Sequence, residues 1–197
     1  MTGAADIAHL MGGVMLVLTL LVLAQRRTVS AIGAYSLQSV ALGLAAAAHG
    51  WDQGRFALLG VAAIVLAVQA MAIPVGLRRV ARETSPFDGG SPAAMALGVG
   101  VVVLAILAVR GAMLPPAMAR EDLAAALSVT LLGVLIVVTR RDPLGQMLGF
   151  LSAVSGCLLA AVSLPGLPMV AILLGMALLA VPALGVLILR HAAGHPS

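Results

Sequence analysis

Three neutral side chains are the polar groups best placed for chemistry inside the long apolar segments of this sequence: Gln38, Gln69 and Ser155. Amide and hydroxyl groups can bond to a neighbouring helix or hold water in a channel, but they are not acids or bases near neutral pH. Hydrogen bonding between helices is the default interpretation of such residues, and a role in wetting a channel is the alternative. The apolar segments therefore contain neutral polar side chains but no acidic or basic side chain next to them.

Ionisable groups are absent from the middle of every apolar segment. The 7 acidic residues fall at segment ends or between segments, and so do the basic residues, all of which are arginine. Glu121 and Asp122 are expected to open a helix, where acidic side chains suit the positive end of the helix dipole. His9 and His49 lie near segment ends, where we expect interfacial side chains rather than proton shuttles. A carboxylate relay through this chain alone is therefore not expected.

Motifs for catalysis or cofactor binding are missing from the sequence. It contains no Ser/His/Asp arrangement, no phosphate-binding loop, no dinucleotide fingerprint and no HExxH zinc motif. A single cysteine, Cys157, provides neither a disulfide framework nor a cysteine metal site. We therefore expect no catalytic residue, no cofactor site and no metal site in this chain.

The composition excludes an ordinary water-soluble domain. Of the 197 residues, 62% are hydrophobic and 9% are charged, and the mean hydropathy is +1.16, whereas roughly a quarter of the residues of a soluble domain are charged. The apolar stretches are nearly continuous, which favours helices over the alternating strands of a membrane barrel. The net charge of +4 comes from arginines scattered at segment ends, a topology signal rather than a nucleic-acid site. The expected fold is an all-α integral membrane bundle.

Charges, glycines and prolines divide the chain into seven apolar segments of about the 20 residues that a spanning helix needs. The expected helices cover residues 7–24, 31–49, 55–77, 93–109, 123–138, 144–162 and 167–189. Pro115 and Pro116 break the chain between the fourth and fifth segments. A four-helix part over residues 1–112 is therefore expected to precede a three-helix part over residues 113–197.

Arginines set the expected orientation, because short cytoplasmic loops carry an excess of basic residues. One side of the expected bundle holds Arg26, Arg27, Arg78, Arg79, Arg82, Arg140, Arg141 and Arg190, and the other side holds Arg55, Arg110 and Arg120. We therefore expect the N-terminus outside and the C-terminus in the cytoplasm.

A longer pattern runs through the last three expected helices. It consists of the sequence TRRDPLGQMLGF over residues 139–150, Gly156, and an apolar final helix that ends at Arg190. Earlier in the chain, a Tyr-x-x-Gln-Ser motif is formed by Tyr35, Gln38 and Ser39, and a helix exit by Pro74, Arg79, Ala81 and Arg82. With these motifs the chain resembles, over nearly its whole length, component E of hydrogenase-4 and formate hydrogenlyase-type complexes. The last three helices of that family are similar to the K (4L) subunit of respiratory complex I.

The sixth expected helix and the turn before it supply the expected contacts. Gly145, Gly149 and Gly156 form part of a small-residue stripe that lets another helix approach closely. The basic turn formed by Arg140, Arg141 and Asp142 leads into that helix on the cytoplasmic side, as it does in the family. The resemblance makes this turn a candidate contact with partner subunits.

The chain departs from the family at the ionisable positions of the membrane interior. Val154 stands where the family has the Glu of a Glu-Asn-Gly triplet, and Ala171 and Ala177 stand where it has a Glu and an Asp. Gln69 stands in place of a membrane Lys. Each ionisable group of the family's lateral proton path is replaced by a neutral residue, which implies a packing role without a carboxylate relay.

The resemblance implies a non-catalytic, multi-pass subunit in the cytoplasmic (inner) membrane of a bacterium. Its complex would be a complex I-like or membrane-bound [NiFe]-hydrogenase-like oxidoreductase, with antiporter-like subunits, a membrane anchor and a soluble redox arm as partners. A [NiFe] centre and iron–sulfur clusters would belong to those partners. Two alternatives stay open: proton translocation through water and polar side chains, and an independent small-molecule transporter. The second is weakened because no inverted repeat is visible.

Overall fold

All regular elements that the structure describes are helices. The computed structural model describes residues 3–81, 91–112 and 117–163. The helices in these ranges are α1 (Gly3–Ala24), α2 (Thr28–Asp52), α3 (Phe56–Ile64), the π-helix η1 (Val65–Ala72), α4 (Ile73–Ala81), α5 (Pro92–Gly111), α6 (Ala117–Thr139) and α7 (Pro143–Ser163). The expected all-helical fold is confirmed.

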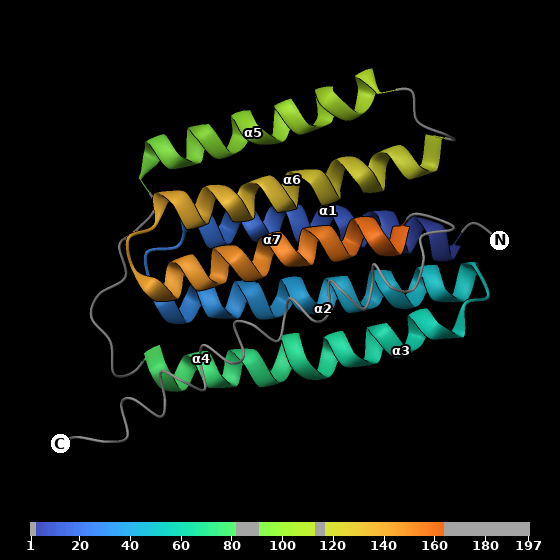
Figure 1. Ribbon diagram of the computed structural model, residues 1–197, viewed down its shortest axis with the longest axis horizontal. Helices are drawn as coiled ribbons and strands as arrows, with labels where there is room; N and C mark the ends of the chain where they lie inside the picture. Colours follow the sequence, from blue (N-terminus) through green and yellow to red (C-terminus); the bar gives the residue numbers. More distant parts are fainter. Residues whose placement is uncertain (1–2, 82–90, 113–116, 164–197) are drawn as a thin grey trace.

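Within the described residues, six helical stretches are long and apolar enough to cross a membrane. They cover Asp6–Ala24, Thr28–Asp52, Phe56–Arg79, Pro92–Gly111, Arg120–Thr139 and Pro143–Ser163. Successive stretches run in opposite directions, so the N-terminus and the end of α7 lie at the same end of the bundle (Figure 1). The seventh expected helix, with Ala171 and Ala177, lies outside the described residues. The count of seven and the orientation of the termini stay predictions.

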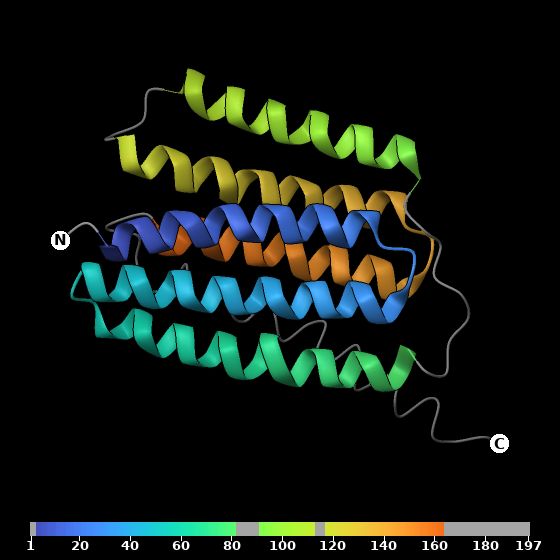
Figure 2. The ribbon, with the colours of Figure 1, turned by 180° about the vertical axis from the view of Figure 1, so that it is seen from behind.

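Four helices form the centre of the bundle and the others flank it. α1 packs against α2 and α6, and α7 packs against α6 and α2. The continuous helix α3–η1–α4 covers α2 on one side, and α5 covers α6 on the other (Figures 1 and 2). Residues 1–112 and 113–197, the two expected parts, are therefore in contact through their central helices, and the boundary between them stays a prediction.

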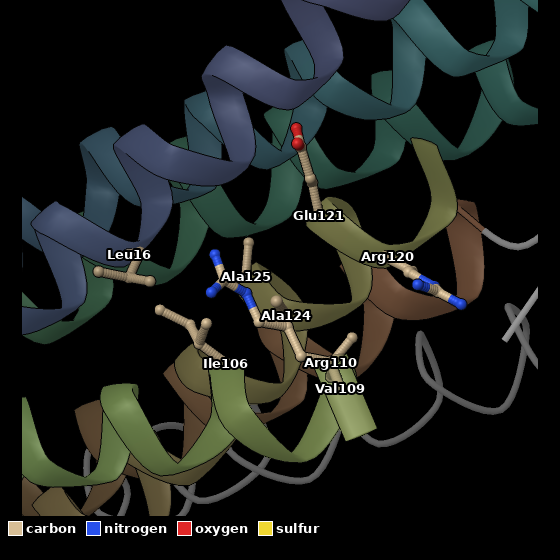
Figure 3. A pocket seen from close by; sticks show the side chains of 8 residues that line it. All are labelled: Leu16, Ile106, Val109, Arg110, Arg120, Glu121, Ala124 and Ala125. Carbon is tan, nitrogen blue, oxygen red and sulfur yellow. The ribbon is translucent and has the colours of Figure 1, made fainter. Parts of the chain in front are cut away.

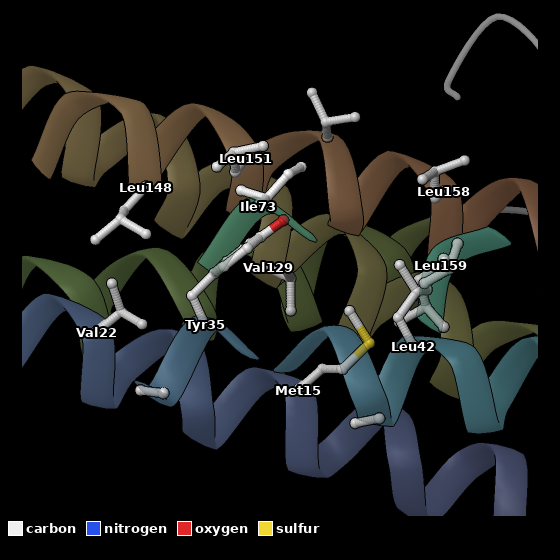
Figure 4. Close-up of a cluster of buried hydrophobic side chains, with 14 of the residues drawn as sticks. Met15, Val22, Tyr35, Leu42, Ile73, Val129, Leu148, Leu151, Leu158 and Leu159 are labelled. Carbon is white, nitrogen blue, oxygen red and sulfur yellow. The ribbon is translucent and has the colours of Figure 1, made fainter. Parts of the chain in front are cut away.

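The core is built from large side chains on the facing sides of the central helices. Tyr35, Met15 and Leu148 are among the largest fully buried residues (Figure 4). Many other large hydrophobic residues point outward, among them Leu104 and Leu107 on α5. Such a surface is unfavourable in water, whereas a lipid environment accommodates it without cost.

Ser–Pro and Asp–Pro pairs define where two of the helices begin. The Ser91 hydroxyl caps α5 by accepting a hydrogen bond from the Ala94 backbone N–H at 3.1 Å, and Pro92 follows as the first helical residue. Asp142 and Pro143 play the same roles at the start of α7. Proline suits the first turn because its missing N–H has no partner within the helix there.

The third span changes helical register in its middle. Residues 65–72 form a π-helix, in which the backbone N–H of Ile73 donates to the Val68 carbonyl. Pro74 follows, so its missing N–H leaves a carbonyl of the preceding turn without a donor. The Ser36 hydroxyl of α2 donates to the Ala70 carbonyl at 2.8 Å. The wide π-helical turn and the Ser36 side chain of the neighbouring helix α2 thus compensate for the backbone hydrogen bond that a proline removes from a membrane span.

Ser36→Ala is expected to lower the free energy of unfolding by about 1 kcal/mol, because the Ala70 carbonyl loses its donor. In a Pro74→Ala background the same change should cost less, since residue 74 regains an N–H that can donate to the carbonyl four residues earlier. Denaturant unfolding in mild detergent, measured for the four chains of this double-mutant cycle, gives the difference.

Ser128→Ala is the matched control, because the Ser128 hydroxyl donates to Ala124 within its own helix. Equal costs of Ser36→Ala in the two backgrounds would contradict the role assigned to Ser36.

Candidate functional site

The polar residues singled out in the sequence are fully buried. Gln38 lies on α2, Gln69 on η1 and Ser155 on α7, and none of the three exposes its side chain. Tyr35 on α2 and Ser152 on α7 are equally buried. We call these five residues the polar band. α2 packs against both η1 and α7, so the band lies where these helices meet.

The hydroxyl groups inside the bundle mostly bond within their own helix. Ser155 donates to the Leu151 carbonyl at 2.9 Å, and Ser39 donates to the Tyr35 carbonyl at 3.0 Å. Ser152 is different, because its hydroxyl crosses from α7 to α2 and donates to Gln38 Oε1 at 3.2 Å. This bond confirms that the polar residues of α2 and α7 meet.

The amide groups of the polar band have unused hydrogen-bonding capacity. Gln38 Nε2 and both polar side-chain atoms of Gln69 are buried and have no hydrogen-bond partner within the described part of the chain. The Tyr35 hydroxyl lies within reach of the Ser39 and Ser155 hydroxyls but makes no bond of good geometry. Buried polar groups are normally paired with protein or ordered water. The band can therefore bind water or a polar group, and it offers no carboxylate or ammonium.

The turn between α6 and α7 holds its first arginine inside the protein. Arg140 is buried, and its Nη2 donates to the carbonyl oxygens at the end of α1: Val22 at 3.2 Å, Leu23 at 3.0 Å and Gln25 at 2.8 Å. The last carbonyls of a helix lack partners within the helix. Arg140 therefore caps α1, and its guanidinium is directed into its own chain rather than toward a partner subunit.

The other two residues of this turn differ in their surroundings. Asp142 Oδ2 accepts a hydrogen bond from the Gly145 backbone N–H at 2.5 Å and so caps α7. A Cβ atom on Gly145 would lie 2.7 Å from the same oxygen, so a glycine is needed beside the cap. Arg141 is exposed. The contact with partner subunits that is expected of this turn stays a prediction. Of the three residues, Arg141 is the exposed one and can reach a partner.

The expected small-residue stripe brings α7 into backbone contact with α6. A Cβ atom on Gly149 would lie 2.7 Å from Val137 N, and one on Gly156 would lie 2.6 Å from Thr130 N. Both distances are shorter than real Cβ contacts. Gly149 and Gly156 thus permit a close approach of the two helices, as the pattern predicts.

Sequence reasoning missed a second group of polar residues, at the end of the bundle that carries the N-terminus. Asp122 Oδ1 lies 2.7 Å from His9 Nδ1, and Asp122 Oδ2 lies 3.4 Å from His49 Nε2. The side chain of Asp122 is only 4% exposed, and those of His9 and His49 are 20% and 10% exposed. We call these three residues the His–Asp–His cluster. Its members come from α1, α6 and α2.

One expectation about these residues is wrong. α6 begins at Ala117, so Asp122 lies in its second turn and does not open the helix, and its side chain is buried. His49 lies near the end of α2, as expected, and is buried beside Asp122; its place at the membrane interface stays a prediction. The available signal was their position at the same end of the expected bundle, since His9 and Asp122 lie near the starts of α1 and α6 and His49 lies near the end of α2, which runs in the opposite direction.

A cavity of about 470 Å³ lies beside this cluster, between α1, α5 and α6. Its wall is mostly apolar, and its charged members are Arg110, Arg120 and Glu121. The Arg110 side chain extends from α5 toward Ala125 of α6, whereas Arg120 points away (Figure 3). The cavity thus places the Arg110 side chain beside the α6 helix.

Metal ligation is not indicated by the geometry: among residues 3–81, 91–112 and 117–163, no three His, Cys, Asp or Glu side chains are grouped to hold a metal ion. In comparisons with protein-family models, curated proteins and solved structures, no match to this chain is found.

Arg140→Gln is expected to lower the free energy of unfolding by about 1.5–3 kcal/mol, because buried carbonyls of α1 lose a charged donor. The matched control is Arg141→Gln at the exposed neighbouring position, which should stay within about 0.5 kcal/mol of the parent chain. Denaturant unfolding of the purified chain in mild detergent checks both values. Equal effects of the two changes would contradict the capping role of Arg140.

Proposed function

We propose that this chain is a non-catalytic membrane subunit of a complex I-like or membrane-bound [NiFe]-hydrogenase-like redox complex. It packs between antiporter-like subunits and the membrane anchor of a soluble redox arm, in the cytoplasmic membrane of a bacterium. The assembly is inferred from the sequence resemblance to hydrogenase-4 component E. The metal centres and the electron carriers belong to the partner subunits.

The observation that carries the non-catalytic role is the neutrality of the polar band. Gln69 and Val154 occupy positions where the family has ionisable residues, and both are buried between closely packed helices. The buried charged residues of the described part, Asp122 and Arg140, lie at opposite ends of α6. The centre of the described bundle is thus suited to holding helices together.

The test is affinity purification of the chain with a tag at its C-terminus, after extraction in mild detergent. We expect antiporter-like subunits and a nickel- and iron-containing redox arm to be recovered with it, identified by mass spectrometry and metal analysis. An unrelated tagged multi-pass protein from the same cells controls for adventitious recovery. Recovery of the chain alone as a defined, metal-free oligomer would contradict the proposal and favour an independent transporter.

A second candidate function is proton translocation through water held by the polar band. The observation in its favour is the unpaired amide of Gln69, which needs a polar partner in the bundle interior. On this hypothesis Gln69→Leu and Ser155→Ala each lower the number of protons pumped per turnover by the complex in vesicles. Ser128→Ala is the control, because that hydroxyl bonds only within α6. Unchanged pumping in both variants would exclude this function.

A further inference from the structure

The helix α5 packs closely at its start and diverges from its neighbours toward its end. A Cβ atom on Gly98 of α5 would lie 2.7 Å from Leu23 Cδ2 of α1 and 3.3 Å from Leu132 Cδ2 of α6, so the three helices are in tight contact there. Toward the end of α5 the ribbons of α5 and α6 move apart (Figures 1 and 2). The cavity of about 470 Å³, which is lined by Ile106 and Val109 of α5, lies at this diverging end.

The lining of the cavity suits an amphipathic ligand. Apolar side chains from α1, α5 and α6 form most of its wall, among them Leu16 and Ile106. Arg110, Arg120 and Glu121 also line it and are exposed, so the cavity reaches the surface of the bundle at their level. Small-molecule sites typically have a volume of roughly 300–1,000 Å³ and a mostly apolar wall with a few polar groups. The cavity meets both conditions.

The charged part of the lining favours an anion. The Arg110 side chain extends from the last turn of α5 toward Ala125 of α6 (Figure 3). Two arginines and one glutamate give the lining one excess positive charge, whichever of these three side chains pair with one another. The His–Asp–His cluster is not part of the lining. A guanidinium binds a phosphate group through two parallel N–H···O bonds, which makes phosphate a well-matched anion for Arg110.

The surroundings of the cavity indicate that its ligand comes from the bilayer. The two helices α1 and α5 that contribute to its wall also carry large exposed hydrophobic side chains, such as Val17 and Leu107. Both helices are long and apolar enough to span a membrane. Arg110 is the last residue but one of the α5 span, and an arginine at the end of a span places its charge among the lipid head groups. A phosphate on Arg110 would therefore lie at head-group level, with the apolar wall beside the acyl chains.

We propose that this cavity binds one anionic phospholipid. Its phosphate group accepts hydrogen bonds from the Arg110 guanidinium, and one acyl chain lies along the apolar wall formed by α1, α5 and α6. The lipid fills the space at the diverging end of α5 and so joins this helix to the centre of the bundle. The site is a property of the chain itself and does not rest on the assembly proposed above.

The first test measures lipid binding to the purified full-length chain in mild detergent by native mass spectrometry, with phosphatidylglycerol as the probe. We expect Arg110→Gln to weaken binding of the first lipid by about tenfold, because a charged hydrogen-bond donor is lost. Arg55→Gln lies at the same end of the bundle but outside the cavity, so it is the matched control and should bind lipid as the parent chain does. Equal affinities of the parent chain and Arg110→Gln would overturn the proposal.

The second test fills the cavity without changing its charge. Ala124→Leu enlarges a side chain of the lining, and we expect the bound phosphatidylglycerol to be lost. Ala108→Leu makes the same change at an exposed position of α5 outside the lining and should leave binding unchanged. Since Arg110 is exposed, the first test does not depend on how Ala124→Leu folds. Undiminished lipid binding by Ala124→Leu would overturn the proposal.

Two further probes distinguish this lipid from other occupants. Phosphatidylcholine with the same acyl chains should bind more weakly, because its ammonium group cancels the charge of the phosphate. Inorganic phosphate should not displace the lipid, because it has no acyl chain to bury. Displacement by inorganic phosphate would contradict the proposal and assign the cavity to a free anion. A lipid-free dimer that is abolished by Ala124→Leu would also contradict it and assign the cavity to a second copy of the chain.

Discussion

Backbone carbonyl and N–H groups inside a bilayer must find partners within the protein, and this requirement accounts for most of the specific contacts in the bundle. Arg140 binds the carbonyls at the end of α1, Asp142 binds the free N–H at the start of α7, and Ser36 binds a carbonyl near Pro74. In each case a buried or half-buried polar side chain completes the hydrogen bonds of a helix. Hydrophobic residues, by contrast, are distributed over both the inner and the outer faces.

The same requirement divides the buried polar side chains into two kinds. Most serine and threonine hydroxyls bond to their own helix, with Ser36 and Ser152 bonding across to another helix, whereas Gln38 and Gln69 keep donors or acceptors for other groups. Among the residues that the structure describes, the buried charged side chains are Asp122 and Arg140, near the two ends of α6 and ~27 Å apart along that helix. That distance is close to the thickness of a hydrocarbon core. Neutral polar groups in the middle and hydrogen-bonded charges at the ends fit a helical subunit that packs against others.

Much of the helical framework could be predicted because it depends on local sequence. Apolar runs of sufficient length, the Ser91–Pro92 and Asp142–Pro143 helix starts and the glycines of α7 all act within one helix or one turn. The burial of Asp122 could not be predicted in this way, since it requires α1 and α2 to bring His9 and His49 to the same place. The π-helix was missed for a related reason: the carbonyl near Pro74 is satisfied by Ser36, which belongs to another helix. The Arg140 cap could not be predicted either, because its acceptors lie more than a hundred positions away in the sequence.

The Arg140 cap also bears on how the chain is assembled in the membrane. When α1 leaves the ribosome, Arg140 has not yet been synthesised, so the carbonyls of Val22, Leu23 and Gln25 must be hydrated at the membrane surface until α6 has been inserted. At the other end of α1, His9 likewise lacks its partner until Asp122 has been synthesised. The hydrogen bonds at both ends of α1 can thus form only after α6 and the turn that follows it have been made.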